Sequence, residues 1–374
     1  MSEQANIPHF KQPLLPTPFH ARTRAASLLA LDLEIGQPGL LAALPPQRLR
    51  LELLDYPGEW LLDLPLLGLG FGAWSAVALR RLEKRSEAAD FLGFVRALPA
   101  AAPAEETLAR AGHRHYRTLL HRLRDAAGLS LLQPGRFLMP TPGPQPPWLE
   151  FFPLAGDSPL AGLLRGRYDA YVAAVRDQLM APGFARVDRL VVLADLLSAL
   201  HAGPAAFADA TAALAEVAEA LRWSGSGMLP DWLSALLGLG ISRVAFAATK
   251  ADHVADRQRG NLAALAAAVT RLPVRGGVRT GVFAVASVRC TEDVVWALDG
   301  HPVSAVRGRV AGAERAGRSY PGEVPDRPPG PEFWTHPFLA LPDFEPMRLP
   351  LGGKGGVPHV NLDALLAFLL EDVL

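Results

Sequence analysis

Alternating hydrophobic and polar positions predict two strands near the start of the chain. In the segment 28–35, Leu31, Leu33 and Ile35 share one side while polar residues occupy much of the other. The segment 49–54 alternates in the same way, and the loop between the two segments is rich in Gly and Pro. The pattern therefore predicts an antiparallel hairpin with a long loop.

Three later apolar runs lack this alternation. They lie at 190–194, 244–248 and 281–286, and such runs are typical of parallel strands that are buried on both faces. Between them, a segment that opens at Gly203-Pro204 repeats apolar residues at intervals of three and four, which predicts a helix. Strands that alternate with helices predict an α/β fold with a doubly wound sheet.

The remaining pattern suggests the domain organisation. Residues 1–20 are expected to be an extended lead-in, and 21–60 with 188–300 an α/β core. Residues 61–187 show mostly helical spacing, so we interpret them as a helical insertion. The segment from about 288 to 350 is rich in Pro, Gly and Arg and is expected to be irregular with short strands. Residues 301–374 are expected to form a C-terminal extension that an amphipathic helix closes.

Composition narrows the classes of function. The 374 residues carry 37 Lys and Arg against 37 Asp and Glu, so no general field favours nucleic acid or anionic lipid. Cys290 is the single cysteine, which excludes an internal disulfide and fits a cytoplasmic protein. No apolar stretch is long enough to span a membrane.

Three histidines, His113, His115 and His121, lie in a basic helical segment. Their spacing sends them to different faces of a helix, so they do not converge on a metal ion. We interpret this segment as a solvated basic helix.

The first candidate motif is Asp55-Tyr56-Pro57-Gly58, which follows the strand at 49–54. An Asp at the carboxyl end of a strand can reach Mg²⁺ through water, and a Gly allows a backbone amide to approach a γ-phosphate. The alternative is a simple β-turn, since Asp, Pro and Gly occupy favoured turn positions.

Two further motifs follow the buried runs. Thr249-Lys250-Ala251-Asp252 resembles a guanine-specifying motif, in which a carboxylate accepts N1–H and N2–H of guanine and a Lys stem covers the base. Ser287-Val288-Arg289 comes where a backbone amide would meet the guanine carbonyl oxygen. The alternative for Thr249–Asp252 is an exposed Lys and Asp at the start of a helix. The order of the three motifs along the chain favours a GTPase-type core.

Four stretches closely resemble the YcjX-like P-loop NTPases: LELLDYPGEWLLDLPLL at 51–67, VDRLVVLADLLSALHAGPAAF at 187–207, FAATKADHV at 246–254 and VPHVNLDALLAFLL at 357–370. The resemblance covers about residues 20–374. It implies a cytoplasmic, stress-associated nucleoside triphosphatase with a Ras-like core and a large helical insertion. It also implies a working relationship with a YcjF-like membrane protein.

The resemblance assigns roles to individual residues. Asp55 would hold Mg²⁺ through water, Gly58 would sense the γ-phosphate, and Thr23 is a candidate switch residue on the metal or a simple loop residue. Glu59 follows Gly58, where Ras-type enzymes place the side chain that orients the attacking water. Its carboxylate could accept a hydrogen bond from water but would repel phosphate. Thr249, Lys250, Asp252, Ser287 and Val288 would bind the base.

One departure from the family pattern is large. The phosphate-binding loop GxxxxGK followed by Ser or Thr is absent from this sequence. The Gly-rich stretch at 352–356 is no substitute, because Val357 and Pro358 follow it instead of a hydroxyl residue and a helix. The strand that feeds this loop would be central in a Ras-like sheet, between 49–54 and 190–194. Our hypothesis is an N-terminally shortened product or a misassigned start, which leaves a gap in the sheet.

The sequence thus favours a relative of GTP-preferring NTPases, with ATP as a possible ligand, Mg²⁺ as cofactor and compromised hydrolysis. A non-hydrolysing α/β scaffold that acts through its helical insertion is the alternative. A nucleotide-sensing regulator completed by another chain is a third reading.

Overall fold

The computed structural model describes residues 27–35, 47–56, 58–126, 128–129, 132–138, 146–179, 186–222, 241–271, 278–335, 341–347 and 356–373. The predicted lead-in at 1–20 and Thr23 lie outside these ranges. The chain divides into two compact units, Met1–Gly58 and Glu59–Leu374.

The first unit contains the predicted hairpin. Strands β1 (Ser27–Ile35) and β2 (Gln47–Asp55) pair antiparallel, with Leu29 opposite Leu53 and Leu33 opposite Leu49. Because side chains alternate along a strand, these residues share one apolar face. The other face carries the ion pairs Arg48–Glu34 and Arg50–Asp32. The alternation in the sequence therefore predicted both the strands and their two faces.

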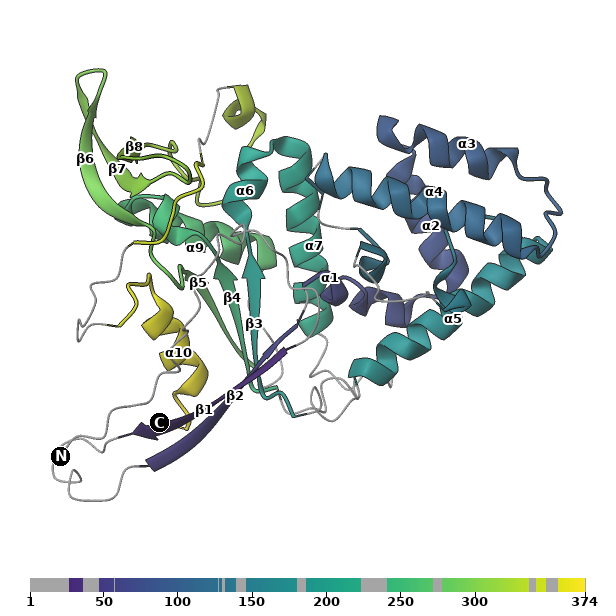
Figure 1. Ribbon diagram of the computed structural model, residues 1–374, viewed down its shortest axis with the longest axis horizontal. Coiled ribbons are helices and arrows are strands. Elements are labelled where there is room, and N and C mark those ends of the chain that lie inside the picture. The colour runs from purple at the N-terminus through teal and green to yellow at the C-terminus, as the bar shows by residue number, and fades with distance from the viewer. Residues whose placement is uncertain are drawn as a thin grey trace. The chain divides into compact units, whose positions relative to one another are not determined.

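The second unit contains a parallel sheet in the order β3-β4-β5, formed by Arg189–Ala194, Arg243–Ala248 and Arg279–Ala284 (Figure 1). Every residue of β4 is buried, as predicted. β3 differs, because Leu193 is 68% exposed and β3 ends this sheet among the described strands. The sequence predicted the strands, but burial on both faces holds only for β4. The predicted gap in the sheet, left by a missing central strand, stays a prediction.

Helices cover both faces of the parallel sheet. Helices α6 (Leu196–His201), α7 (Pro204–Arg222) and α9 (Asp256–Thr270) contribute to one core with residues such as Val244 and Phe246. Helix α10 (Leu362–Leu370) packs Leu365 and Leu369 against Ala245 and Ala247 on the other face. Because alternate residues of β4 point to opposite faces, one strand contributes to both cores. The order of strands and helices agrees with the predicted α/β fold.

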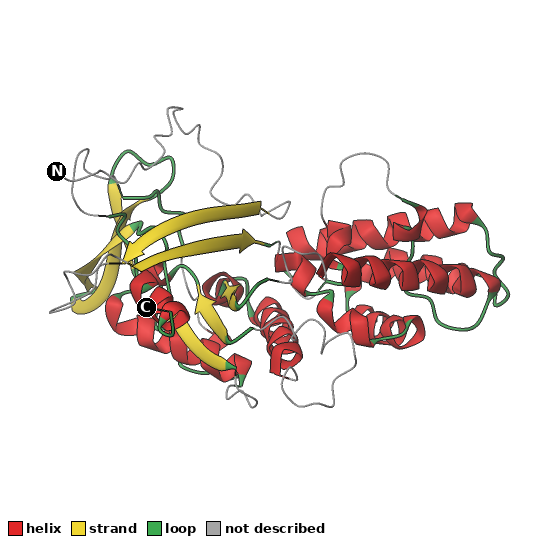
Figure 2. Ribbon diagram, turned by 90° about the horizontal axis from the view of Figure 1, so that it is seen from below, coloured by secondary structure: helices red, strands yellow, loops and turns green. Residues whose placement is uncertain are grey.

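The described residues between Gly58 and Leu179 form helices and loops, with no strand among them (Figure 2). Their core is aromatic: Trp74 stacks on Tyr168 with ring centroids 5.1 Å apart and meets Phe151 edge-on at 5.5 Å. Arg81 pairs with Glu216 at 2.6 Å and so joins this helical part to α7. The elements in chain order are α1 (Gly58–Leu61), η2 (Leu64–Gly68), α2 (Phe71–Leu82), η3 (Ser86–Ala88), α3 (Ala89–Ala97), α4 (Glu106–Asp125), η4 (Gly135–Leu138), η5 (Pro147–Leu149) and α5 (Pro159–Leu179).

The prediction of a solvated basic helix is wrong for His113, which is 4% exposed. Its Nδ1 lies 3.2 Å from the carbonyl oxygen of Phe151. His113 lies one helical turn before Tyr116 on α4, so it shares the buried stripe rather than the basic face. His115 is exposed and stacks on Phe94. No group of three or more metal-ligating side chains occurs in the described part of the chain.

The region expected to be irregular with short strands contains an antiparallel sheet. Its strands are β6 (Thr291–Leu298), β7 (His301–Arg309) and β8 (Ala316–Ser319). The two-residue turn Asp299-Gly300 has φ of 49° and 81°, the conformation that Asp-Gly hairpins favour. A short helical turn, η8 (Pro331–Thr335), follows these strands. Among the described helices, none is long and apolar enough to cross a bilayer.

Candidate functional site

The candidate base-binding residues lie at one edge of the parallel sheet. Asp195 follows β3, Thr249 follows β4, and Ser287 comes shortly after β5. The carboxyl ends of parallel strands share an edge, which is where ligands bind in open α/β sheets. The Thr249 amide donates to the carbonyl oxygen of Ala194 at 2.9 Å, so the ends of β3 and β4 are directly joined.

Hydrogen bonds bring two of the three predicted motifs together. The Ala251 amide donates to the carbonyl oxygen of Val285 at 3.1 Å, and the Cys290 amide donates to Asp252 Oδ2 at 2.6 Å. The Thr291 hydroxyl donates to the carbonyl oxygen of Asp252. The loop after β5, residues 286–290, is therefore held against the Thr-Lys-x-Asp motif; we call it the base loop.

Asp252 lies in the helical turn η7 (Ala251–His253) and is 2% exposed. Burial raises the pKa of its carboxyl, but hydrogen bonds from His253 and the Cys290 amide outweigh burial and hold the pKa below its ordinary value. The group is thus ionised at neutral pH. An ionised carboxylate has about four acceptor positions, so its partners leave capacity for a guanine edge. Because the carboxylate is covered, a base reaches it only if the covering side chains move.

Lys250 adopts the left-handed conformation, with φ of 60°. Its Nζ lies 2.8 Å from Asp195 Oδ2 and 2.8 Å from Ser198 Oγ. Asp195 also caps α6, because its Oδ1 accepts from the Ser198 amide at 3.0 Å. Sequence reasoning missed Asp195 and Ser198. The available signal was an Asp directly after an apolar run with a Ser three residues later, a helix-start pattern.

The other predicted residues belong to the first unit, lie in the base loop, or have side chains that the structure does not describe. Asp55 is the exposed last residue of β2, and Gly58 begins α1, so both belong to the first unit. Glu59 lies within α1, but its side chain is outside the description, as is Thr23. Ser287 and Val288 are exposed in the base loop. The structure therefore joins Thr249–Asp252 with 287–291 and leaves the metal-binding prediction untested.

The residues present fit a guanine base better than a magnesium triphosphate. Asp252 offers an ionised carboxylate beside the base loop, as a guanine edge requires. For the phosphates, the sequence contains no GxxxxGK loop, which would supply the amide nest, the Lys and the hydroxyl on Mg²⁺. For Mg²⁺, the predicted residue Asp55 supplies a single carboxylate.

A parallel α/β sheet with paired loops at its carboxyl edge is consistent with a P-loop GTPase-like fold. The model of the "YcjX-like family, DUF463" matches residues 10–374, and the chain belongs to this family. The chain is 32% identical over 383 aligned residues to "Ras-like GTPase YcjX" of Escherichia coli strain K12, across 97% of this chain and 80% of that protein. It is also 32% identical to the protein of the same name from Shewanella oneidensis, across 96% and 78% of the two chains. The predicted family is confirmed.

Proposed function

We propose that this protein binds guanine nucleotides, with GTP preferred over ATP, and that its hydrolysis is compromised by the absence of the GxxxxGK loop. The hydrogen bond from the Cys290 amide to Asp252 Oδ2 carries the proposal, because it unites two motifs that are 38 residues apart. The similarity to proteins named Ras-like GTPase supports it.

In this proposal Asp252 accepts N1–H and N2–H of guanine, a pair of donors that adenine does not offer. The backbone of Ser287 and Val288 meets the guanine carbonyl oxygen, while the stem of Lys250 covers the base plane beside Thr249. Asp55 would hold Mg²⁺ through water, and that ion would neutralise phosphate charge. A role in stress responses and a YcjF-like partner stay predictions.

The test is titration of a fluorescent guanine nucleotide, with adenine nucleotides as competitors. Asp252→Ala should weaken guanine binding at least about tenfold, because a charge-assisted pair of hydrogen bonds is lost. Asp326→Ala is the matched control, since Asp326 is an exposed Asp paired with the adjacent Arg327. Asp252→Asn should turn preference toward xanthine nucleotides, because an amide offers one acceptor and one donor.

One observation favours a second function. The sequence lacks the phosphate-binding loop, so the protein could act as an α/β scaffold through its helical part, with nucleotide irrelevant. Absence of saturable binding at millimolar guanine nucleotide would reject the first proposal and leave the scaffold.

A further inference from the structure

Helix α10 is tied to the base loop at its amino end. Val360 and Ala286 exchange both backbone hydrogen bonds, at 2.8 and 3.1 Å. The Arg289 amide donates to the carbonyl oxygen of Pro358 at 2.7 Å, and Asn361 Nδ2 donates to that of Ala284 at 2.9 Å. The segment 358–361, which leads directly into α10, therefore pairs with the loop that covers Asp252.

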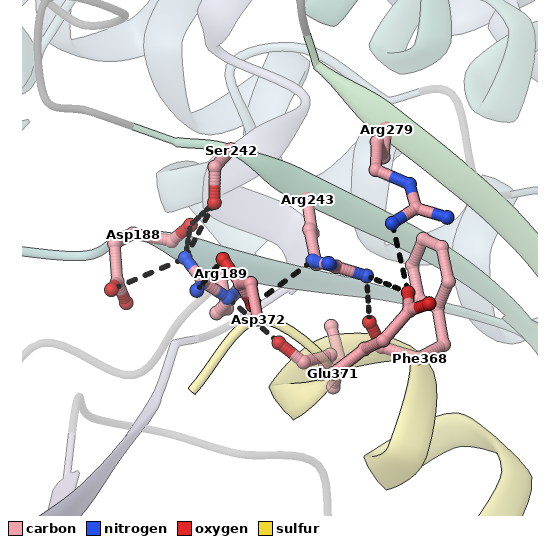
Figure 3. Close-up of polar contacts among 9 residues, drawn as sticks. Asp188, Arg189, Ser242, Arg243, Arg279, Phe368, Glu371 and Asp372 are labelled. Carbon is pink, nitrogen blue, oxygen red and sulfur yellow. Dashed lines mark hydrogen bonds and ion pairs between the residues drawn. The ribbon is translucent and has the colours of Figure 1, made fainter. Parts of the chain in front are cut away.

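The carboxyl end of α10 is tied to the opposite edge of the same sheet. Arg189, Arg243 and Arg279 begin β3, β4 and β5 and are aligned by the strand register; we call them the arginine row (Figure 3). Glu371 Oε2 bridges Arg243 and Arg279, at 2.8 Å from each. Asp372 bridges Arg189 at 2.8 Å and Arg243 at 3.2 Å. Three guanidinium groups thus alternate with two carboxylates.

The arginine row also donates hydrogen bonds to carbonyl groups at the carboxyl end of α10. Arg243 Nη1 donates to the carbonyl oxygen of Phe368 at 2.6 Å, and Arg189 Nε donates to that of Leu369 at 2.7 Å. Cations are favoured at a helix carboxyl end, where carbonyl groups lack partners within the helix. The side chain of Arg243 is 4% exposed, whereas those of its partners Glu371 and Asp372 are 57% and 42% exposed.

Apolar packing also holds α10 on the sheet. Leu365 and Leu369 cluster with Ala245, Ala247 and Val285, and the rings of Phe368 and Phe283 lie 5.5 Å apart. On the solvent side, Leu366 is 37% exposed. The polar anchor at Glu371 and Asp372 adds to this packing at the carboxyl end of the helix, where it connects the helix to the first residue of each strand of the sheet.

We propose that the arginine row positions the base loop through α10. The helix spans the sheet between two anchors, so release at Glu371 and Asp372 lets it move and withdraws the 358–361 segment from Ala286 and Arg289. The base loop then loosens, and Asp252 loses the Cys290 amide. The expected loss of nucleotide affinity rests on the proposed function, whereas the expected loosening of the base loop does not.

Cys290 provides a direct readout, since it is the single cysteine and lies in the base loop. Burial, with the nearby Asp252 carboxylate, raises the pKa of its thiol to about 12, so it reacts slowly while the loop is closed. The experiment measures its rate of reaction with 5,5′-dithiobis(2-nitrobenzoate). Glu371→Gln with Asp372→Asn should accelerate it several-fold, and Glu371→Lys with Asp372→Lys should accelerate it further, by about tenfold or more.

The matched control is Glu87→Gln with Asp90→Asn, which removes the same two charges from the helical part. It should leave the Cys290 rate unchanged. Hydrogen exchange separates positioning from general destabilisation: the Ala286 and Arg289 amides should exchange faster in the anchor variants, while the Phe246 and Ala247 amides on β4 stay protected. Unchanged Cys290 rates, or equal acceleration of all four amides, would overturn the proposal.

Nucleotide titration completes the experiment. If wild-type protein binds guanine nucleotide, the anchor variants should bind it more weakly and the control variant equally well. If the wild type binds none, the proposed function fails, while the thiol and exchange measurements still decide the role of the arginine row.

Discussion

Lys250 Nζ and Asp195 Oδ2 lie 2.8 Å apart and join the carboxyl ends of β4 and β3. This pair fixes the lysine of the Thr-Lys-x-Asp motif to the neighbouring strand end. Asp195 performs a second task with its other oxygen, which caps α6. One carboxylate therefore links the Thr-Lys-x-Asp motif to the helix that follows β3.

The two tasks of Asp195 can be separated by substitution. Asp195→Asn keeps an acceptor for the Ser198 amide but loses the charge, so it should lower the free energy of unfolding by less than about 1 kcal/mol, because the pair is partly solvated. Asp195→Ala also loses the cap and should cost about 1–2 kcal/mol. Urea unfolding measures both. Equal effects of the two substitutions would contradict the capping role.

The buried carboxyl of Asp63 should make stability fall as pH rises. Burial raises its pKa to about 6, although hydrogen bonds from Tyr171 and the Gly135 amide oppose the rise. The unfolded chain ionises near its ordinary value, about 3.9, so the folded state binds more protons between about pH 4 and 6. Across this window, ionisation of Asp63 should lower the free energy of unfolding by about 3 kcal/mol.

Asp63→Asn should remove this loss, because the amide stays neutral at every pH. Relative to wild type, the variant should gain stability between pH 4 and 6 and keep that gain above pH 6. The measurement is urea unfolding at half-unit intervals, with the exposed Asp157→Asn as control. Parallel profiles for wild type and Asp63→Asn would show that the carboxyl titrates normally.

The buried imidazole of His113 should make stability fall as pH decreases. Burial lowers its pKa, and the hydrogen bond to Phe151 opposes the shift. Arg117 and Arg167 also lower it, while Glu150 raises it. Below about pH 6.5 the unfolded chain takes up a proton that the folded state resists, so stability falls with decreasing pH. His113→Asn, which can still donate to Phe151, should flatten this decline in unfolding measured from pH 7.5 to 5.

Replacement by alanine should have opposite effects on stability at two glycines in helices. At Gly112 a Cβ would lie 2.2 Å from a ring atom of buried Phe152, so Gly112→Ala should destabilise by about 1–3 kcal/mol through overpacking. At exposed Gly166 on α5 nothing lies within 4 Å, so Gly166→Ala should stabilise by about 0.5–1 kcal/mol. Thermal unfolding compares them. A stabilising Gly112→Ala would show that Phe152 yields without strain.

Local pattern predicted those parts of the fold that depend on one segment. The hairpin alternation and the unbroken apolar run of β4 follow from which face each side chain meets. The helix after Gly203-Pro204 was also predicted, since α7 begins at Pro204. The antiparallel sheet was predicted less well. β7 contains Pro, Arg and Gly, which favour irregular structure, and its pairing with β6 and β8 makes it a regular strand of nine residues.

By itself the sequence determined the order of the parallel strands and the helices between them, the candidate motifs and the family, because these depend on residue types and their spacing. Tertiary structure alone decided that the Cys290 amide meets Asp252 and that Arg189 meets the end of α10, 180 residues away from Leu369. It also decided the burial of His113. Such contacts depend on how separate elements pack in space, and no local periodicity records that packing.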